Sequence, residues 1–325
     1  MAPSVGSSLN LETNRRRTVG FHMKTIFLFT KSDIKTVLIP QSVFALSMVY
    51  SQRRLEDTLA QPFNSSQTTS RLIYMMVWIY LHLLVEDITN QRKPKSVLED
   101  KINRPWRPIP AGRLTAAEAR SILRIAVFLS LATSFVLNTW MTSVSLMTAI
   151  WLYNDLDCHN AGPWLRNGLN VAGMTCFGRG AVTVLLGGHI GGETEKTLRN
   201  WHVLMGAVIQ TTVHAQDFAD IAGDKARNRK TMPLLYCEAL SRWTVAVPVP
   251  VWSFICLNFW HVDSWVVQGV LLGIAGNIAV LVTVKWGKQC DEWAWRLWCL
   301  WVTVLYLLPL FSSTISPETP LTGGI

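Results

Sequence analysis

The sequence predicts an all-α integral membrane protein that crosses the bilayer nine times. Half of the 325 residues are hydrophobic, only 16% are charged, and 15 are tryptophans. This composition is typical of membrane proteins rather than of soluble enzymes. Apolar stretches of about 20 residues, the length that crosses a bilayer as a helix, occur nine times along the chain.

The nine stretches divide the chain into a membrane domain and two tails. The membrane domain is predicted to cover 33–312, between an N-terminal tail (1–32) and a C-terminal tail (313–325). Pro40, inside the first stretch, is expected to kink that helix, and the kink could open a cavity or simply be tolerated. The predicted spans, in order, are 33–51, 71–89, 117–138, 140–156, 168–188, 201–218, 240–260, 265–284 and 293–312.

The distribution of positive charge predicts the orientation of these spans. The N-terminal tail and the second, fourth, sixth and eighth loops contain 19 lysines and arginines, whereas the opposite side has 5, which include Arg71 at the edge of the second span. By the positive-inside rule the N-terminus is cytosolic and the C-terminal tail is lumenal. The lack of other targeting signals indicates the endoplasmic reticulum, where Asn64 would lie in a lumenal glycosylation sequon. The net charge of +9 suits lipid headgroups and a diphosphate, and we expect no nucleic-acid partner.

Aromatic residues are frequent in the second span and in the last three. Tyr74, Trp78, Tyr80 and His82 lie in the second span, and such residues are usually packing or interface anchors. The alternative is a cavity wall whose ring faces stabilise a carbocation. In the last three spans, several tryptophans at the predicted boundaries are expected to form an interfacial belt. The six cysteines show no C-x-x-C spacing and are expected to be small apolar side chains rather than disulfides or zinc ligands.

The sixth span ends in an acidic motif that is followed by basic residues. Asp217, Asp220 and Asp224 are spaced so that all three leave one face of a helix. Three close carboxylates repel one another unless a cation lies between them, and oxygen ligands of this kind favour Mg²⁺. Positive side chains that could bind a diphosphate follow directly: Lys225, Arg227 and Arg229. A charged helix end that merely faces water is the alternative interpretation.

The loop between the second and third spans repeats the same order of charged residues, acidic first and basic next. Glu86 and Asp87 end the second span, Asn90 follows, and Asp100 precedes Arg107 in a proline-rich turn. Two similar loops on the cytosolic side suggest two halves of the protein that face one substrate. An asparagine in place of a carboxylate weakens the charge at a metal site, although its carbonyl oxygen can still bind Mg²⁺.

Three further polar residues within or beside the spans are candidates for the same site. Arg179 lies inside the fifth span, where an arginine requires a polar cavity or an ion-pair partner such as Asp155. Arg166, in the turn before that span, could also bind a diphosphate. His214 precedes Asp217 by three residues, so it could act as a base or a diphosphate donor, or simply support the neighbouring residues.

These motifs resemble those of the UbiA superfamily of intramembrane prenyltransferases. From Asp100 to Gly112 the chain reads D-x-x-N-x-P-x-R-P-x-P-x-G, and D-x-x-D-x-x-x-D follows four helices later. The first motif departs from the family's N-D-x-x-D-x-x-x-D, because it has Asn90 at the second aspartate. The sequence from Tyr153 to Cys158, YNDLDC, and the turn at 165–167 look most like the fungal UbiA-type terpene cyclases of secondary metabolism, such as the cyathane diterpene cyclases of mushrooms.

The resemblance implies two four-helix bundles plus a ninth helix around a central cavity. It also implies that Mg²⁺ and an isoprenyl diphosphate bind beneath a cytosolic cap. We therefore expect a terpene cyclase that releases diphosphate, with geranylgeranyl diphosphate favoured over farnesyl diphosphate. An aromatic prenyltransferase shares the ionisation step and is the alternative. A transporter would leave two magnesium-type motifs on the same face unexplained, because transporter sites lie near the bilayer midplane.

Overall fold

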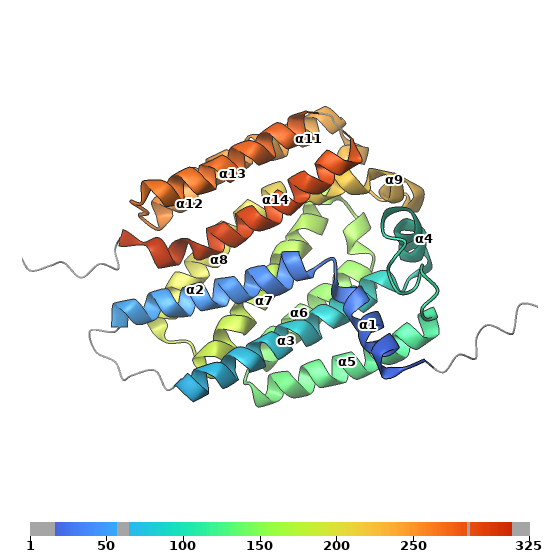
Figure 1. The fold of residues 1–325 in the computed structure, drawn as a ribbon, viewed down its shortest axis with the longest axis horizontal. Helices are drawn as coiled ribbons and strands as arrows, with labels where there is room; N and C mark the ends of the chain where they lie inside the picture. Colours follow the sequence, from blue (N-terminus) through green and yellow to red (C-terminus); the bar gives the residue numbers. More distant parts are fainter. Residues whose placement is uncertain (1–16, 57–64, 285–286, 314–325) are drawn as a thin grey trace, which may run out of the picture.

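The computed structural model describes residues 17–56, 65–284 and 287–313, and within them the regular structure is helical (Figure 1). Asn64, with its sequon, and nearly all of the predicted C-terminal tail lie outside the described residues. The elements are α1 (Val19–Thr30), π-helix η1 (Ile34–Leu38), α2 (Ile39–Glu56), α3 (Ser65–Gln91), α4 (Pro94–Asn103), α5 (Ala116–Val136), α6 (Trp140–Asn154), 3₁₀ turn η2 (Cys158–Asn160), α7 (Pro163–Leu186), α8 (Gly192–Thr212), 3₁₀ turn η3 (Val213–Gln216), α9 (Asp217–Arg227), α10 (Met232–Leu235), α11 (Glu238–Ala246), α12 (Pro248–Phe259), α13 (Trp265–Thr283), α14 (Lys288–Leu307) and 3₁₀ turn η4 (Leu308–Phe311).

The protein is an integral, multi-pass membrane protein. In the described chain, seven helical segments are long and apolar enough to cross a bilayer. The predicted fourth span corresponds to α6, and the predicted sixth, 201–218, covers the second half of α8, η3 and the first two residues of α9. Neither α6 nor α8 is among the seven. α6 has only 15 residues, and the first turns of α8 carry Glu193, Glu195, Lys196 and Arg199. The count of nine spans and their grouping into two bundles and a ninth helix therefore stay predictions.

Local sequence signals explain where several of these helices begin and end. A reciprocal pair of hydrogen bonds between Thr115 and Glu118 forms a capping box at the start of α5. Pro163 occupies the first turn of α7, and Gly187 ends that helix in the left-handed conformation. Pro248 lacks a backbone N–H, which separates α11 from α12. The predicted seventh span is thus two consecutive helices.

Large aromatic side chains pack the interior between the helices. Trp78 is fully buried, where it packs on Phe177 and donates to the Ser134 hydroxyl over 2.8 Å. Trp298 and Trp301 are also buried, and their indole N–H groups donate to the hydroxyls of Thr212 and Ser253. The expectation of an interfacial belt therefore does not apply to these two tryptophans.

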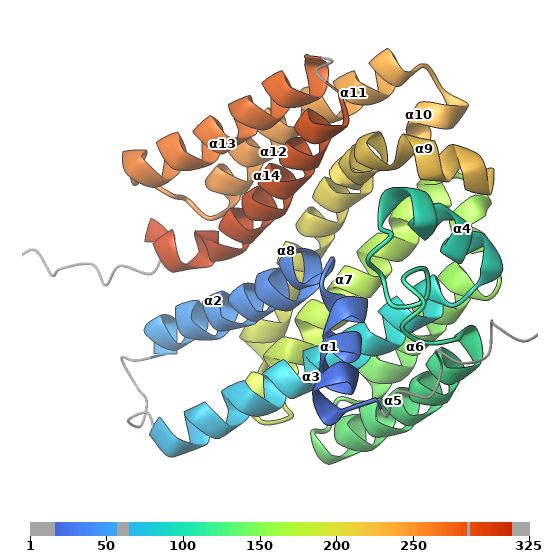
Figure 2. The ribbon, with the colours of Figure 1, turned by 45° about the vertical axis from the view of Figure 1, so that its right-hand side comes forward.

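One end of the molecule carries a cap of short elements. In Figures 1 and 2, α1, α4 and α9 lie together at that end. The predicted N-terminal tail thus contains a helix. Gln91 of α3 donates to the Phe29 carbonyl of α1, and Arg113 donates to Thr25 and to the Phe21 carbonyl. These hydrogen bonds hold α1 against the end of α3 and against the loop that follows α4.

Candidate active site

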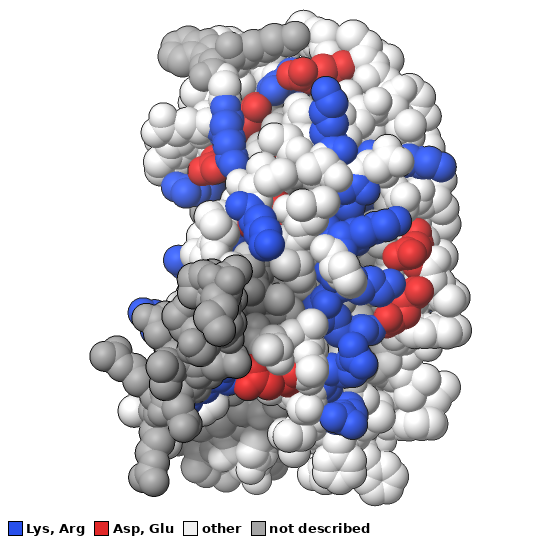
Figure 3. Space-filling view, turned by 90° about the vertical axis from the view of Figure 1, so that its right-hand side faces the viewer, with Lys and Arg blue, Asp and Glu red and all other residues white. Residues whose placement is uncertain are grey.

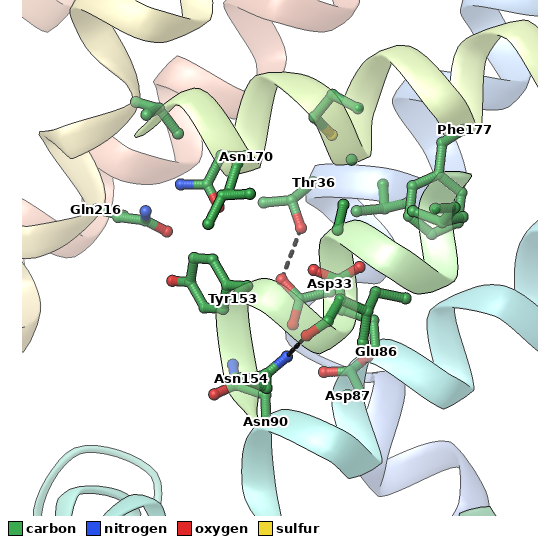
Figure 4. Close-up of a pocket in the computed structure, with 18 of the residues that line it drawn as sticks. Asp33, Thr36, Glu86, Asp87, Asn90, Tyr153, Asn154, Asn170, Phe177 and Gln216 are labelled. Atoms are coloured by element: carbon green, nitrogen blue, oxygen red, sulfur yellow. Dashed lines mark hydrogen bonds between the residues drawn. The ribbon is translucent and has the colours of Figure 1, made fainter. Parts of the chain in front are cut away.

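A cavity lies among η1, α3, α6, α7, η3 and α14, next to the capped end (Figure 4). One part of its lining is polar and the other is apolar. The polar lining consists of Asp33, Thr36, Glu86, Asp87, Asn90, Tyr153, Asn154, Asn170 and Gln216. The apolar lining consists of Val37, Leu146, Ala149, Ile150, Leu169, Gly173, Met174, Phe177, Val213, Trp295 and Trp298.

The apolar wall includes three aromatic rings from two helices. Phe177 comes from α7, while Trp295 and Trp298 of α14 stack with ring centroids 4.8 Å apart. Aromatic faces attract cations, most strongly where water is excluded. A carbocation would therefore find stabilising surfaces here without a nucleophile on this wall.

The polar end carries the first predicted motif. Glu86, Asp87 and Asn90 all line the cavity, as the sequence predicted for the last turns of the second span. Asp87 is 3% exposed, and its Oδ1 accepts from the Gln91 amide over 3.1 Å. Asp100 lies away from the cavity lining and pairs with Arg107 at 2.8 Å.

Each aspartate of the second motif forms an ion pair with an arginine. Both carboxylate oxygens of Asp217 lie 2.6 Å from Nη1 of Arg166, and both residues are buried. Asp220 pairs with Arg104 at 2.8 Å. Asp224 pairs with Arg229 at 3.3 Å. These aspartates lie in the cap next to the cavity, and Gln216, directly before them, lines it.

Tyr153 connects this cap to the cavity. The tyrosine lines the cavity, and its hydroxyl accepts from Arg229 at 3.2 Å and from Arg166 at 3.4 Å. The two arginines that pair with Asp224 and Asp217 therefore reach the cavity edge through one side chain. An anion at this edge would meet two guanidinium groups and a phenol hydroxyl.

The two motif-bearing loops contact each other across α4 and α9. Asn103 donates to the Asp220 carbonyl over 3.2 Å, and Glu99 pairs with Arg227 at 2.7 Å and with Arg229 at 3.1 Å. Burial alone would raise the pKa of Glu99, but the two guanidinium groups lower it to about 2. The two motif-bearing segments thus contact each other directly, whereas the prediction that two halves of the protein face one substrate stays a prediction.

The face above these contacts is strongly basic. Figure 3 shows lysine and arginine side chains gathered in a band on the end that bears α4 and α9. A separate pocket there is lined by Lys93, Pro94, Lys95, Asp157, His159, Asn160, Arg227 and Arg229. Burial lowers the pKa of His159 to about 4, so the ring is neutral at pH 7 and accepts from Arg227.

Several buried carboxylate oxygens fit a hard divalent cation. Asp87 Oδ2, Asp100 Oδ2 and Asp224 Oδ2 are buried and have no hydrogen-bond partner in the described part of the chain. Burial raises the pKa of Asp100, and it raises that of Asp224 to about 7 despite the adjacent Arg229. Among the described residues, no three metal-binding side chains converge on one point. The donors thus fit Mg²⁺, which binds through one or two carboxylates plus water and phosphate oxygens.

Three predicted residues lie elsewhere or make different contacts. Arg179 pairs with Glu195 at 2.7 Å and not with Asp155, which pairs with Arg92. It lies roughly 20 Å along α7 from Arg166, so it is not part of the cap. Lys225 is exposed. His214 does not line the cavity, and its Nε2 bonds to the Thr244 hydroxyl at 2.9 Å.

Of the cavity residues that sequence reasoning did not assign to the site, Asp33 and Tyr153 bear most directly on its chemistry. Asp33 opens the first predicted span and Tyr153 lies near the end of the fourth, so each lies where an apolar stretch meets the capped end. An ionisable residue at such a position is a signal that could have pointed to Asp33. Tyr153 gave no separate signal, because aromatic residues are frequent at span ends in any membrane protein.

The fold and site define an α-helical membrane protein whose cavity has an aromatic wall and a cap of acidic and basic side chains. The family model described as the UbiA prenyltransferase family matches residues 63–311. The chain therefore belongs to the UbiA prenyltransferase family.

Curated relatives resemble most of the chain. The fumagillin beta-trans-bergamotene synthase of Aspergillus fumigatus is 29% identical over 89% of this chain and 92% of the relative. The somaliensene A/B synthase of Streptomyces somaliensis is 26% identical over 93% of this chain and 98% of the relative. A diterpene cyclase of Hericium erinaceus is 28% identical over 70% of this chain and 69% of the relative.

Solved structures share the same fold. A UbiA homologue from Archaeoglobus fulgidus, bound to GPP and Mg²⁺, superposes with a TM-score of 0.58, covering 88% of this chain and 99% of that one. The sequence identity is 10%. The likeness therefore supports the helical arrangement alone.

Proposed function

We propose that this protein is a Mg²⁺-dependent terpene cyclase that ionises an isoprenyl diphosphate and cyclises the resulting carbocation to a hydrocarbon. The observation that carries the proposal is the cavity, which joins an aromatic wall to a polar end beneath paired aspartates and arginines. The relatives named as terpene synthases and a diterpene cyclase support the same reaction class.

The polar end would hold the leaving group. Asp87, Asn90, Asp217, Asp220 and Asp224, with Asp100 nearby, would hold Mg²⁺. Bound Mg²⁺ neutralises charge that develops on the departing diphosphate and so lowers the barrier to C–O cleavage. Further diphosphate charge would be met by the remaining basic residues that the sequence singled out: Arg107, Arg166, Arg227, Arg229 and Lys225.

The described ion pairs would change partners when substrate binds. Arg166 and Arg229 pair with Asp217 and Asp224 and also reach the Tyr153 hydroxyl at the cavity edge. Metal ions that occupy the carboxylates would release these guanidinium groups toward the phosphate oxygens. The guanidinium groups that would bind the diphosphate are thus paired with aspartates in the described structure.

The apolar wall would control the carbocation. Phe177, Trp295 and Trp298 line the cavity, and the surrounding aliphatic residues would exclude water. Exclusion of water lets the cation cyclise before it is captured. We propose geranylgeranyl diphosphate as the substrate, in the endoplasmic reticulum membrane, with the cap facing the cytosol.

The test is to incubate membranes that contain the full chain with Mg²⁺ and either geranylgeranyl or farnesyl diphosphate, without any acceptor. A cyclic hydrocarbon in the extract, absent without Mg²⁺ and in Asp217→Ala, is the expected result. Asp263→Ala, an exposed aspartate in the loop after α12, is the matched control and should retain product. If product forms only after an aromatic acceptor is added, the cyclase proposal is wrong and the protein is a prenyltransferase.

A further inference from the structure

Asp33 is an acidic residue of the cavity that lies outside both motif-bearing loops. It precedes the π-helix η1, and its carbonyl accepts from the backbone N–H groups of Val37 and Leu38. Its carboxylate Oδ1 accepts from the Thr36 hydroxyl over 2.8 Å. In Figure 4 the Asp33 side chain lies on the same side of the cavity as Glu86 and Asp87. Two helices far apart in sequence therefore bring carboxyl groups to one place.

These carboxyl groups have no positive partner in the described chain. No ion pair there involves Asp33, Glu86 or Asp87. The neighbouring cations are engaged elsewhere: Lys35 donates to the Ser32 carbonyl, Arg92 pairs with Asp155 and Arg107 pairs with Asp100. Charges of one sign in an enclosed site repel one another unless a cation joins them.

A second observation points to a ligand. Asp87 is 97% buried, since only 3% of its surface is exposed, and its Oδ2 has no hydrogen-bond partner among the described residues. A buried carboxylate oxygen without a partner is costly, whereas a bound cation would stabilise it. Asp33 and Asp87 line the same cavity, and two carboxylates are the usual protein contribution to Mg²⁺.

The two acidic motifs also differ in their number of carboxylates, and Asp33 would make up the difference. The motif in α9 has aspartates at positions 217 and 220, whereas the motif at the end of α3 has Asp87 and, three residues on, the amide of Asn90. On the basis of the proposed function, we propose that Asp33 is a magnesium ligand that acts together with Asp87. It supplies, from the residue directly before η1, the negative charge that the α3 motif lacks at Asn90.

Metal binding by the purified full chain tests this inference without requiring turnover. Mn²⁺ is titrated in the presence of inorganic diphosphate and detected by electron paramagnetic resonance. We expect Asp33→Asn to weaken Mn²⁺ binding by at least about tenfold, because even partners outside the ligand shell contribute that much to metal affinity. Asp263→Asn is the matched control and should bind Mn²⁺ as the unaltered protein does.

Two further variants keep the result decisive if Asp33→Asn does not fold. Thr36→Val removes the hydroxyl that orients Asp33, and we expect it to weaken Mn²⁺ binding while thermal unfolding without metal stays unchanged. Asn90→Asp should restore binding when it is combined with Asp33→Asn. Mn²⁺ affinity that is unchanged in both Asp33→Asn and Thr36→Val, or an Asn90→Asp that restores nothing, would overturn the inference.

The experiment also separates this inference from the proposed reaction. If Mn²⁺ binding depends on Asp33 but the protein forms no terpene, Asp33 is a metal ligand and the proposed cyclase activity is wrong. If the protein forms a terpene that depends on Mg²⁺ but Mn²⁺ binding does not depend on Asp33, the cyclase is supported and Asp33 is not a metal ligand.

Discussion

Arg166 and Asp217 form a buried ion pair in the cap. The two side chains are 4% and 1% exposed and lie 2.6 Å apart. A buried ion pair adds little net stability, because desolvation offsets the attraction, but removal of one partner leaves an uncompensated charge. Arg166 therefore supplies the positive partner of the buried Asp217 carboxylate.

The first prediction concerns this pair. Arg166→Met should lower the free energy of unfolding by about 3–5 kcal/mol, measured by thermal or denaturant unfolding in detergent. The matched control is Arg296→Met, which removes an exposed partner of Glu292 at 4.0 Å and should change stability by less than about 1 kcal/mol. Adding Asp217→Leu to Arg166→Met should recover most of the loss, whereas activity should stay absent. An additive second loss would contradict the argument.

At the scale of elements, the contact between α4 and α9 brings the two motifs together. Gly223 of α9 faces Asn103 of α4, and a Cβ atom built at Gly223 would lie 2.2 Å from the Asn103 Nδ2. The same Asn103 amide donates to the Asp220 carbonyl. Any larger residue at position 223 would have to displace the Asn103 side chain.

The second prediction follows from that approach. Gly223→Ala should displace the Asn103 amide, weaken the contact between the loops and lower terpene formation at limiting Mg²⁺ more than at saturating Mg²⁺. Gly269→Ala is the control, because a Cβ there meets nothing within 4 Å. Equal activity of the two variants over an Mg²⁺ titration would show that the approach of α4 to α9 does not matter.

The same contact shows what the sequence could and could not predict about the site. The spacing of Asp217, Asp220 and Asp224 and the repeated order of charges indicated two facing loops, and direct contacts join them. Spacing could not reveal that each aspartate pairs with an arginine, because Arg104 and Arg166 come from other elements. Asp33 is a similar case, since its proximity to Asp87 depends on how α2 and η1 pack against α3.

The whole molecule bears on how many times the chain crosses the membrane. The loops at the two ends of α6 bond to opposite ends of the protein. Before α6, Asn138 donates to the Gly188 carbonyl in the loop after α7. Beyond it, Asn160 accepts from the Lys230 N–H, and His159 accepts from Arg227 in the cap. α6 therefore connects the capped end to the opposite end, although 15 residues span only about 22 Å.

The third prediction turns that connection into a topology test. In sealed microsomes of a chain whose native cysteines are replaced, Asp157→Cys should react with a membrane-impermeant maleimide from outside, because the basic cap is expected to be cytosolic. Asn138→Cys should react only after the membrane is opened. Both positions are exposed, so burial does not explain a difference. Labelling of both positions from the same side would mean that α6 does not cross the bilayer, and the nine-span arrangement would then be wrong. Labelling from opposite sides would mean that this 15-residue helix crosses the bilayer, which requires the bilayer to be locally thinned.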